Sequence, residues 1–440
     1  MPLNIQNLET VISTKLKTNP SPEDVLVYAK TIALLKTGTV NVVMSFINLP
    51  GPSSVPNGTL YLVKADDMVY ATDGLSWRPV RDASSGFMFS WGPNASGQLG
   101  DSTLVSKSSP VSVMGGFTDW CQISTATTHS AAVRGNGTLW TWGSNTCGQL
   151  GDNTGIGSSS PVQVVGGVTS WRQVSVGNAH TAAVRTNGTL WTWGGNSLGQ
   201  LGDNTTVSKS SPVSVVGGFT DWCQVSAGSS HTLAIRTNCT LWTWGDNASG
   251  KLGDNSVVNK SSPVLVVGGF ADWVSVSAGG DHTVAVRGNG TLWAWGNNTT
   301  GKLGDNTIVS KSSPVSVVGG FTDWCQVSAG YQHTAAVRSN GTLWAWGCNN
   351  CGQLGDNTIV SQSSPVSVVG DFTDWCQVSA TFANHNIALR MDGTLWSWGC
   401  NSNGQLGSGT IVNRSSPGGV PGNISGWCNI SIQAAITTRT

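Results

Sequence analysis

The chain is poor in charged residues, which occupy 10% of its 440 positions, against about a quarter in an average soluble protein. Lys and Arg total 22 and Asp and Glu also total 22, so the formal net charge is zero. Nucleic-acid binding needs a basic patch that neutralises phosphates, so nucleic acid is not an expected partner. The surface should instead be neutral and rich in Ser, Thr, Asn and Gly, which is typical of extracellular, cell-surface or virion proteins.

Long apolar runs are also missing. Charged residues interrupt the N-terminal region before any apolar run approaches the roughly 18 residues that a membrane helix needs, and the first residues have no secretory pattern. No membrane insertion is therefore expected.

The ten cysteines form no zinc motif. Cys348 and Cys351 have metal or redox spacing, but a structural zinc site needs four ligands and no second pair of this kind exists. Cys400 aligns with Cys348 one repeat later, and the distance between repeats argues against a bridge. Neither a metal nor a disulfide is expected, and isolated thiols fit a reducing cytoplasm.

What the sequence does contain is an internal repeat. A Trp-Gly pair returns seven times at intervals of 51 or 52 residues, at Trp91, Trp142, Trp193, Trp244, Trp295, Trp346 and Trp398. A fixed period near 50 with four short apolar runs per unit predicts a radial array of small sheets. The expected fold is an all-β, seven-bladed β-propeller.

One repeat, residues 212–253, shows the expected strands at 212–216, 223–227, 231–236 and 241–244. The last two are joined in most copies by Asn-Gly, whose residues both tolerate the positive φ of a two-residue hairpin. The incomplete copies at the two ends are complementary. We expect three C-terminal strands and one strand at 87–91 to form the closing blade, which removes exposed sheet edges.

The repeated phrase resembles a known family. Segments such as WGPNASGQLGD, WGGNSLGQLGD and WGCNNCGQLGD are similar to the regulator-of-chromosome-condensation repeat, over about residues 86–440. The resemblance implies a seven-bladed propeller closed by shared strands. It leaves function open, because the family includes exchange factors, ubiquitin-ligase accessory domains and an enzyme inhibitor. The long loop through which the exchange factors act has no counterpart in this regular spacing.

The repeated polar residues are interpreted as scaffold. All six histidines occupy one repeat position, which favours buried hydrogen-bonding struts between blades over a catalytic base. The Asp of each LGD phrase, as at Asp101, is expected to hold a turn. No Ser-His-Asp set, carboxylate pair or phosphate loop stands apart from the repeat, so neither enzymatic activity nor a cofactor is expected.

Positions that differ between copies are more informative. The residues just before each repeated His lie between two strands and hence on one rim, and they are largest and most polar in the later copies. Drift in exposed loops is one explanation. The functional hypothesis is a partner-binding surface formed by Asp281, Tyr331, Gln332, Phe382 and Asn384.

The N-terminal region is predicted to be a separate part. Residues 1–48 should form a helical docking segment, with helices at about 8–17 and from Ser21 to Gly38. Residues 49–85 should form a linker and a small β-meander, followed by the propeller at 86–440. Residues 1–82, with NLETVISTKL and GTLYLVKADDMVYATDGLSWRP, resemble attachment segments of bacteriophage structural proteins.

Together these features predict a viral structural protein, from a phage, located in the virion after assembly in the host cytoplasm and release by lysis. Residues 1–58 would dock on other virion proteins. The propeller would serve as tail fibre, adhesin or decoration protein and recognise a host receptor or glycan. The alternative is a soluble intracellular propeller that binds a protein partner as a regulator, exchange factor or inhibitor.

Overall fold

The computed structural model describes residues 40–43, 60–63, 68–72, 77–80, 87–380, 382, 384–421, 427–431 and 436–439. The chain divides into two compact units, Met1–Ser84 and Ser85–Thr440. The regular structure of the described residues consists of β-strands, and the helices predicted before Gly38 lie outside these residues. Within the described part of the chain, no helix has the length and apolar character that a membrane crossing requires.

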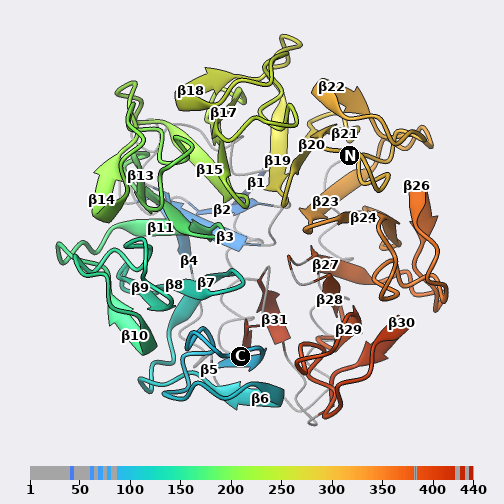
Figure 1. Ribbon diagram of the computed structural model, residues 1–440, viewed down its shortest axis with the longest axis horizontal. Helices are drawn as coiled ribbons and strands as arrows, with labels where there is room; N and C mark the ends of the chain where they lie inside the picture. Colours follow the sequence, from blue (N-terminus) through green and yellow to red (C-terminus); the bar gives the residue numbers. More distant parts are fainter. Residues whose placement is uncertain are drawn as a thin grey trace. The chain divides into compact units, whose positions relative to one another are not determined.

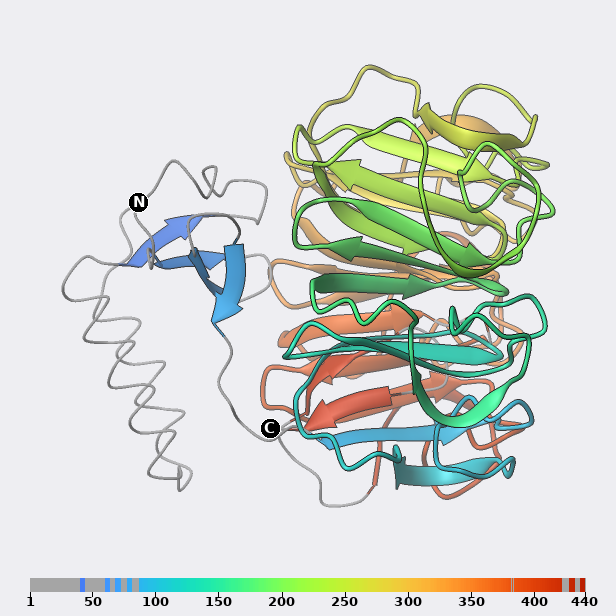
Figure 2. The same cartoon turned by 90° about the vertical axis from the view of Figure 1, so that its left-hand side faces the viewer.

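The first unit contains a small sheet, drawn in blue in Figure 2. Strands β2 (Leu60–Val63), β3 (Met68–Thr72) and β4 (Trp77–Val80) form the predicted antiparallel meander. Strand β1 (Val40–Val43) pairs with β2 in parallel. This strand was not predicted, and it begins two residues after Gly38, where the second helix was expected to end.

The second unit is an all-β propeller, as predicted, with sheets arranged around a centre (Figure 1). Six of its sheets each contain four strands that are consecutive in sequence. The inner strands begin at a repeated Trp: β7 (Trp120–Thr125), β11 (Trp171–Val176), β15 (Trp222–Ala227), β19 (Trp273–Ala278), β23 (Trp324–Ala329) and β27 (Trp375–Ala380). The second strands begin at the repeated His: β8 (His129–Arg134), β12 (His180–Arg185), β16 (His231–Arg236), β20 (His282–Arg287), β24 (His333–Arg338) and β28 (His385–Arg390).

The outer half of each sheet carries the Trp-Gly phrase and a Ser-rich edge. The third strands are β9 (Leu139–Gly143), β13 (Leu190–Gly194), β17 (Leu241–Gly245), β21 (Leu292–Gly296), β25 (Leu343–Gly347) and β29 (Leu395–Gly399). The outer strands are β10 (Ser158–Gln163), β14 (Lys209–Ser214), β18 (Lys260–Leu265), β22 (Lys311–Ser316), β26 (Gln362–Ser367) and β30 (Arg414–Gly419).

A further four-stranded sheet joins the two ends of this unit. Its order is β31 (Trp427–Ile430), β32 (Ile436–Arg439), β5 (Phe87–Gly92) and β6 (Lys107–Ser112), with β32 antiparallel to β5. Two strands therefore come from each end of the propeller, whereas three C-terminal strands and one N-terminal strand were predicted. The reason is that each Ser-rich strand pairs with the third strand of its own repeat, as β30 does with β29, and so closes a blade instead of starting the next.

The tight turn between the second and third strands also differs from the predicted one. Gly137 has φ 76°, whereas Asn136 is not among the residues with positive φ. The Asn136 side chain has another role, because its Oδ1 accepts hydrogen bonds from Thr138 N at 3.1 Å and Thr138 Oγ1 at 2.7 Å. The Asn thus favours the turn through side-chain bonding and only the Gly through backbone freedom.

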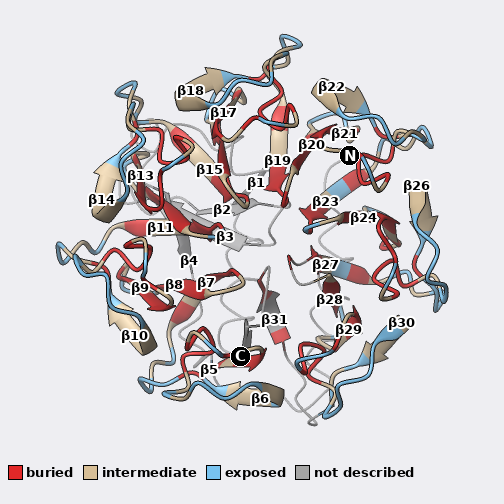
Figure 3. Cartoon of the chain, in the orientation of Figure 1, coloured by how far each residue is buried: buried red, intermediate tan, exposed pale blue. Residues whose placement is uncertain are grey.

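The apolar core lies between neighbouring blades, and buried residues gather on the inner three strands of each blade while the outer strands are half-buried (Figure 3). One cluster joins Val284 and Val286 of β20 to Trp324 and Val327 of β23, and it also contains Trp346 of β25. Blades are held together across these faces by burial of large side chains, which is why a single blade could not be stable alone.

Candidate functional site

The loops that follow the inner strands and those that follow the third strands lie at the same edge of the propeller, because successive strands of a blade are antiparallel. A backbone bond confirms their contact: Ser144 N donates to Thr128 O at 2.8 Å. The loops between second and third strands lie at the opposite edge. The five residues predicted to bind a partner all lie in loops that follow inner strands, so they belong to the first of these two edges, which we call the rim.

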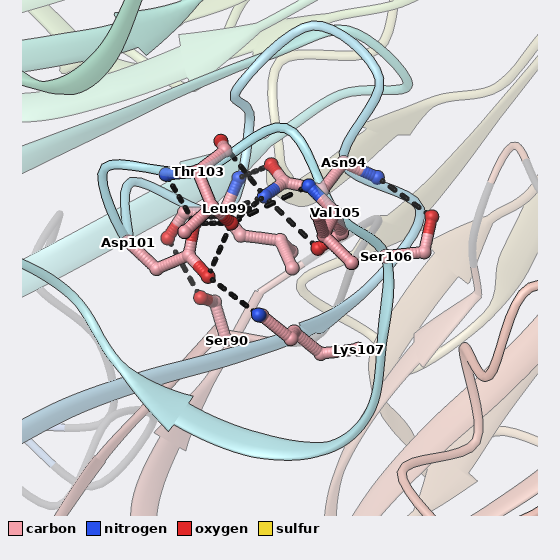
Figure 4. A network of polar contacts seen from close by, with 8 residues as sticks. All are labelled: Ser90, Asn94, Leu99, Asp101, Thr103, Val105, Ser106 and Lys107. Carbon is pink, nitrogen blue, oxygen red and sulfur yellow. Dashed lines mark hydrogen bonds and ion pairs between the residues drawn. The ribbon is translucent and has the colours of Figure 1, made fainter.

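The loop after β5 is held by an Asn and an Asp, and the same pair recurs after the third strands of the other repeats except the last, where Ser408 replaces the Asp (Figure 4). Asn94 Nδ2 donates to Asp101 Oδ1 at 2.9 Å, and Asn94 Oδ1 accepts from Leu99 N at 2.9 Å. Asp101 also accepts from Thr103 N at 3.0 Å, which confirms its turn-holding role. Burial alone would raise the pKa of Asp101, but bonds from Thr103 and Asn94 and the charge of Lys107 outweigh it and lower that pKa.

Five of the six repeated histidines, His129, His180, His231, His282 and His333, connect adjacent blades, as predicted. His129 Nε2 lies 3.0 Å from Thr181 Oγ1 in the next blade, and His333 Nε2 lies 3.0 Å from Asn386 Oδ1. Both imidazoles are fully buried. Burial lowers the pKa of His129 to about 3, with His180 adding to the effect, and lowers that of His333 to about 4. These residues are neutral struts at physiological pH, and they fix the loops next to them.

Asp281 is partly exposed and carries an ion pair. Its carboxylate is 2.9 Å from Lys251 Nζ, and Asp246 binds the same ammonium at 2.6 Å. The Lys251 side chain is 2% exposed while the Asp281 side chain is 42% exposed. Asp281 therefore joins one blade to the next and still presents part of its carboxylate to solvent.

Tyr331 and Phe382 meet across neighbouring blades. Their rings are edge to face, with centroids 6.5 Å apart, an arrangement that aromatic pairs prefer. Tyr331 is 40% exposed, whereas Phe382 is 9% exposed and supports it from below. Phe382 was expected at the surface, and its burial is a correction. Gly280 lies next to Tyr331, because a Cβ on Gly280 would come within 2.5 Å of the Tyr331 ring.

Gln332 and Asn384 occupy the same rim and are anchored through their backbones. Gln332 O accepts from Cys348 N at 2.9 Å and from Thr300 Oγ1 at 3.1 Å. Asn384 has φ 54°, and its carbonyl accepts from Cys400 N at 3.0 Å. We call Asp281, Tyr331, Gln332, Phe382 and Asn384 the rim strip. They lie in loops of three consecutive blades, and Gln332 and Asn384 are partly exposed.

Two features of this rim were missed by sequence reasoning. The first is a disulfide between Cys351 and Cys400, whose Cα atoms are 5.0 Å apart. It corrects the expectation that repeats are too far apart, since the loop of one blade lies against the Trp-Gly phrase of the next. The second is the pair Lys251 and Lys302, which are almost completely buried. The sequence could have revealed these two lysines, because GKLG replaces the repeated GQLG at their positions.

Comparisons with known proteins agree with this architecture. The family model of the RCC1-like domain matches residues 87–437. The ultraviolet-B receptor UVR8 of Arabidopsis thaliana is 30% identical over 345 residues, which cover 76% of this chain and 77% of the receptor. Protein pim1 of Schizosaccharomyces pombe is 28% identical, over 64% of this chain and 59% of that protein.

The fold is also that of a solved structure. Prp20p from Saccharomyces cerevisiae, described with its binding properties to Gsp1p and histones, superposes with a TM-score of 0.71. It is 18% identical, and the match covers 81% of this chain and 91% of Prp20p. At this identity the likeness establishes the fold alone.

These relatives correct the predicted function. A plant receptor and yeast proteins are cellular proteins, so the expectations of a phage structural protein, a virion location and virion partners are wrong. The match to N-terminal attachment segments of phages has no support, because the family model covers only the propeller. The chain belongs to the RCC1-like domain family.

Proposed function

We propose that this propeller is a non-enzymatic regulatory protein that binds a protein partner through the rim strip. The observation that carries the proposal is Tyr331, an exposed aromatic side chain held in place by the buried Phe382 ring. Tyrosine is enriched among residues that dominate binding energy, and a preorganised ring loses little entropy on binding. Prp20p, which shares this fold, is described with its binding properties to Gsp1p and histones, so a propeller of this kind can bind proteins.

We further propose that the sheet of β31, β32, β5 and β6 is a seventh blade that closes the ring. Pairing of Ile436 with Ser90 and of Arg439 with Phe87 supports this closure. A closed ring has no unpaired sheet edges and would hold the loops of the rim strip in fixed relative positions.

The test compares two matched substitutions. Tyr331→Ala removes an aromatic side chain from the rim strip, and Met391→Ala removes a large apolar one that is 65% exposed in a turn at the opposite rim. Proteins bound to the full chain in cells would be crosslinked and quantified for both variants. We expect Tyr331→Ala to lower recovery of the bound partner about 30-fold, as for a hot-spot residue, and Met391→Ala to leave it unchanged. The reverse pattern would refute the rim strip as the binding surface.

A further inference from the structure

Two neighbouring blades place a lysine at the same position but in different electrostatic surroundings. Lys251 and Lys302 are 1% and 2% exposed. The other repeats carry Gln at this position: Gln98, Gln149, Gln200, Gln353 and Gln405. In those repeats the amide oxygen accepts a backbone bond, as Gln98 Oε1 does from Ser96 N at 3.0 Å. A lysine has no acceptor and cannot replace that bond.

The charge of Lys251 is fully compensated within the protein. Its Nζ lies 2.6 Å from the Asp246 carboxylate, five residues before it, and 2.9 Å from the Asp281 carboxylate on the next blade. Asp281 is the residue just before the repeated His282. Both carboxylates thus come from fixed positions of the repeat.

Lys302 lacks both of these partners. The two equivalent positions hold Asn297 and Gln332, so each carboxylate is replaced by an amide. Asn297 Oδ1 is already used, because it accepts from Thr299 N at 3.2 Å and Thr299 Oγ1 at 2.9 Å. Among the residues that the structure describes, none lies within ion-pair distance of the Lys302 ammonium, in contrast to Lys251. Its Nζ is not among the fully enclosed polar atoms without a hydrogen-bond partner, so this atom keeps some contact with solvent although the residue is almost completely buried.

An ammonium in this position is unfavourable unless a negative charge compensates it. The surroundings agree, since burial lowers the pKa of Lys302, and Asp281 opposes that effect while Lys251 adds to it. A Gln would avoid this loss, as it does in five other repeats. An anion from outside the chain would therefore compensate the charge of Lys302.

We propose that Lys302 binds the carboxylate of an acidic side chain in a partner protein, which takes the place that Asp246 and Asp281 occupy at Lys251. Gln332 lies beside Lys302, because a Cβ on Gly347 would come within 2.7 Å of Gln332 O and 3.2 Å of Lys302 Cβ. Tyr331 is the sequence neighbour of Gln332 in the rim strip. The ligand would be a peptide segment with a Glu or Asp beside an apolar residue that rests on Tyr331. This inference rests on the proposed function, because it specifies the chemistry that the rim strip recognises.

The experiment uses the full chain and three libraries of hexapeptides with randomised flanks around a fixed Glu, Gln or phosphoserine. Enriched peptides are then measured by fluorescence anisotropy against wild-type protein, Lys302→Gln and Gln332→Asp. Gln332→Asp recreates the carboxylate that Asp281 provides to Lys251. The control is Lys260→Gln, an equal change of charge on the outer strand β18, where the corresponding residue of β26 is Gln362.

We expect enrichment in the Glu library only, with at least tenfold weaker binding when Glu is replaced by Gln. Lys302→Gln and Gln332→Asp should each weaken binding at least tenfold, and Lys260→Gln should not. Lys302→Gln should melt at the same temperature as wild type or higher, because a poorly compensated charge is removed.

The proposal is overturned if no Glu peptide is enriched, if Lys302→Gln leaves affinity unchanged, or if phosphoserine peptides bind better than Glu peptides. A marked fall in the melting temperature of Lys302→Gln would also overturn it, since that would reveal a structural partner. If partner recovery depends on Tyr331 but not on Lys302, the carboxylate site fails and the proposed function stands. If it depends on neither, both fail.

Discussion

His180 donates a hydrogen bond to Thr232 of the next blade, across 2.9 Å between Nε2 and Oγ1. The direction follows from Thr232, whose hydroxyl proton is already used in a 2.8 Å bond to Gln200 O. The imidazole must therefore carry its proton on Nε2, which leaves Nδ1 as a lone-pair acceptor. Nδ1 is buried and has no hydrogen-bond partner among the described residues. A second proton on this ring would have nowhere to donate.

This arrangement predicts a steep loss of stability in mild acid. Burial lowers the pKa of five histidines, His129, His180, His231, His282 and His333, from an ordinary value of 6.5. As the pH falls below 6.5, these histidines therefore bind protons in the unfolded chain but not in the folded chain, which lowers the free energy of unfolding. Between pH 7.5 and 5.5 each histidine should lower the free energy of unfolding by about 1.4 kcal/mol, and the five together should lower it by about 7 kcal/mol. Urea unfolding at the two pH values measures this, and an unchanged unfolding free energy would show that the histidines titrate freely.

Among the six blades built from consecutive strands, one lacks an ion pair that the other five have. Arg134 Nε binds Asp119 at 2.7 Å, and the same pair recurs in four other blades, whereas in the blade of Arg185 the repeat position of the Asp holds Ser170. Arg185 Nε is buried and has no hydrogen-bond partner in the described part of the chain, and burial lowers the pKa of Arg185. Ser170→Asp should restore the pair and stabilise the fold by about 0.5–1 kcal/mol. Ser170→Asn is the uncharged control in thermal melts, and equal melting temperatures for the two variants would contradict the ion-pair explanation.

The Cys351–Cys400 disulfide should contribute to stability, since it joins adjacent blades and spans 49 residues. Cys400→Ser should lower the unfolding free energy by roughly 2–4 kcal/mol under oxidising conditions, because the unfolded chain gains freedom. Adding a reductant should lower the stability of the wild type but not of the variant. If the reductant affects both proteins equally, the bridge does not form.

The same loop contact allows a second bridge to be engineered. A Cβ on Gly195 would lie 3.6 Å from Cys147 Cβ, within the range of disulfides. Gly195→Cys should therefore form a bridge with Cys147, detectable by mass spectrometry as the loss of two thiols. Gly195→Ser serves as the control. Failure of this bridge would contradict the placement of the loop against the next blade.

Ring closure by the terminal strands predicts the effect of a truncation. A chain that ends at Ser431 lacks β32 and exposes the edge of β5. We expect a lower melting temperature and a greater tendency to associate through the open edge. The control carries Arg439→Ala, which keeps the strand. If the truncated chain melts like the full one, closure by β32 is refuted.

The architecture could be predicted from the sequence because each repeat contains the residues that form its own strands and its contacts with the next blade. Trp142 is buried and its Nε1 binds Gln98 O at 2.9 Å in the preceding repeat, so a contact between blades is encoded at a fixed spacing. The struts and turn-holding Asp residues were found in the same way. Residues that only maintain the fold are easy to recognise, because they recur at the same position in every repeat.

Contacts made by single copies were harder to predict. Phe382 is in a loop by sequence, yet it is buried because Tyr331 and its blade cover it. The Cys351–Cys400 bridge depends on how closely one loop approaches the next blade, which spacing alone does not give. The family resemblance identified the propeller correctly. The resemblance of residues 1–82 to phage attachment segments, together with the neutral composition, led to the wrong prediction of a virion protein, because a neutral surface is compatible with several locations.

The most direct test of the rim strip is hydroxyl-radical footprinting of the full chain, free and bound to its partner. Tyr331 and Met391 are both exposed, at 40% and 65%, and lie at opposite rims, so each reports on its own face. We predict that the partner protects Tyr331 from oxidation at least fivefold and leaves Met391 unchanged. Protection of Met391 with unchanged oxidation of Tyr331 would contradict the account.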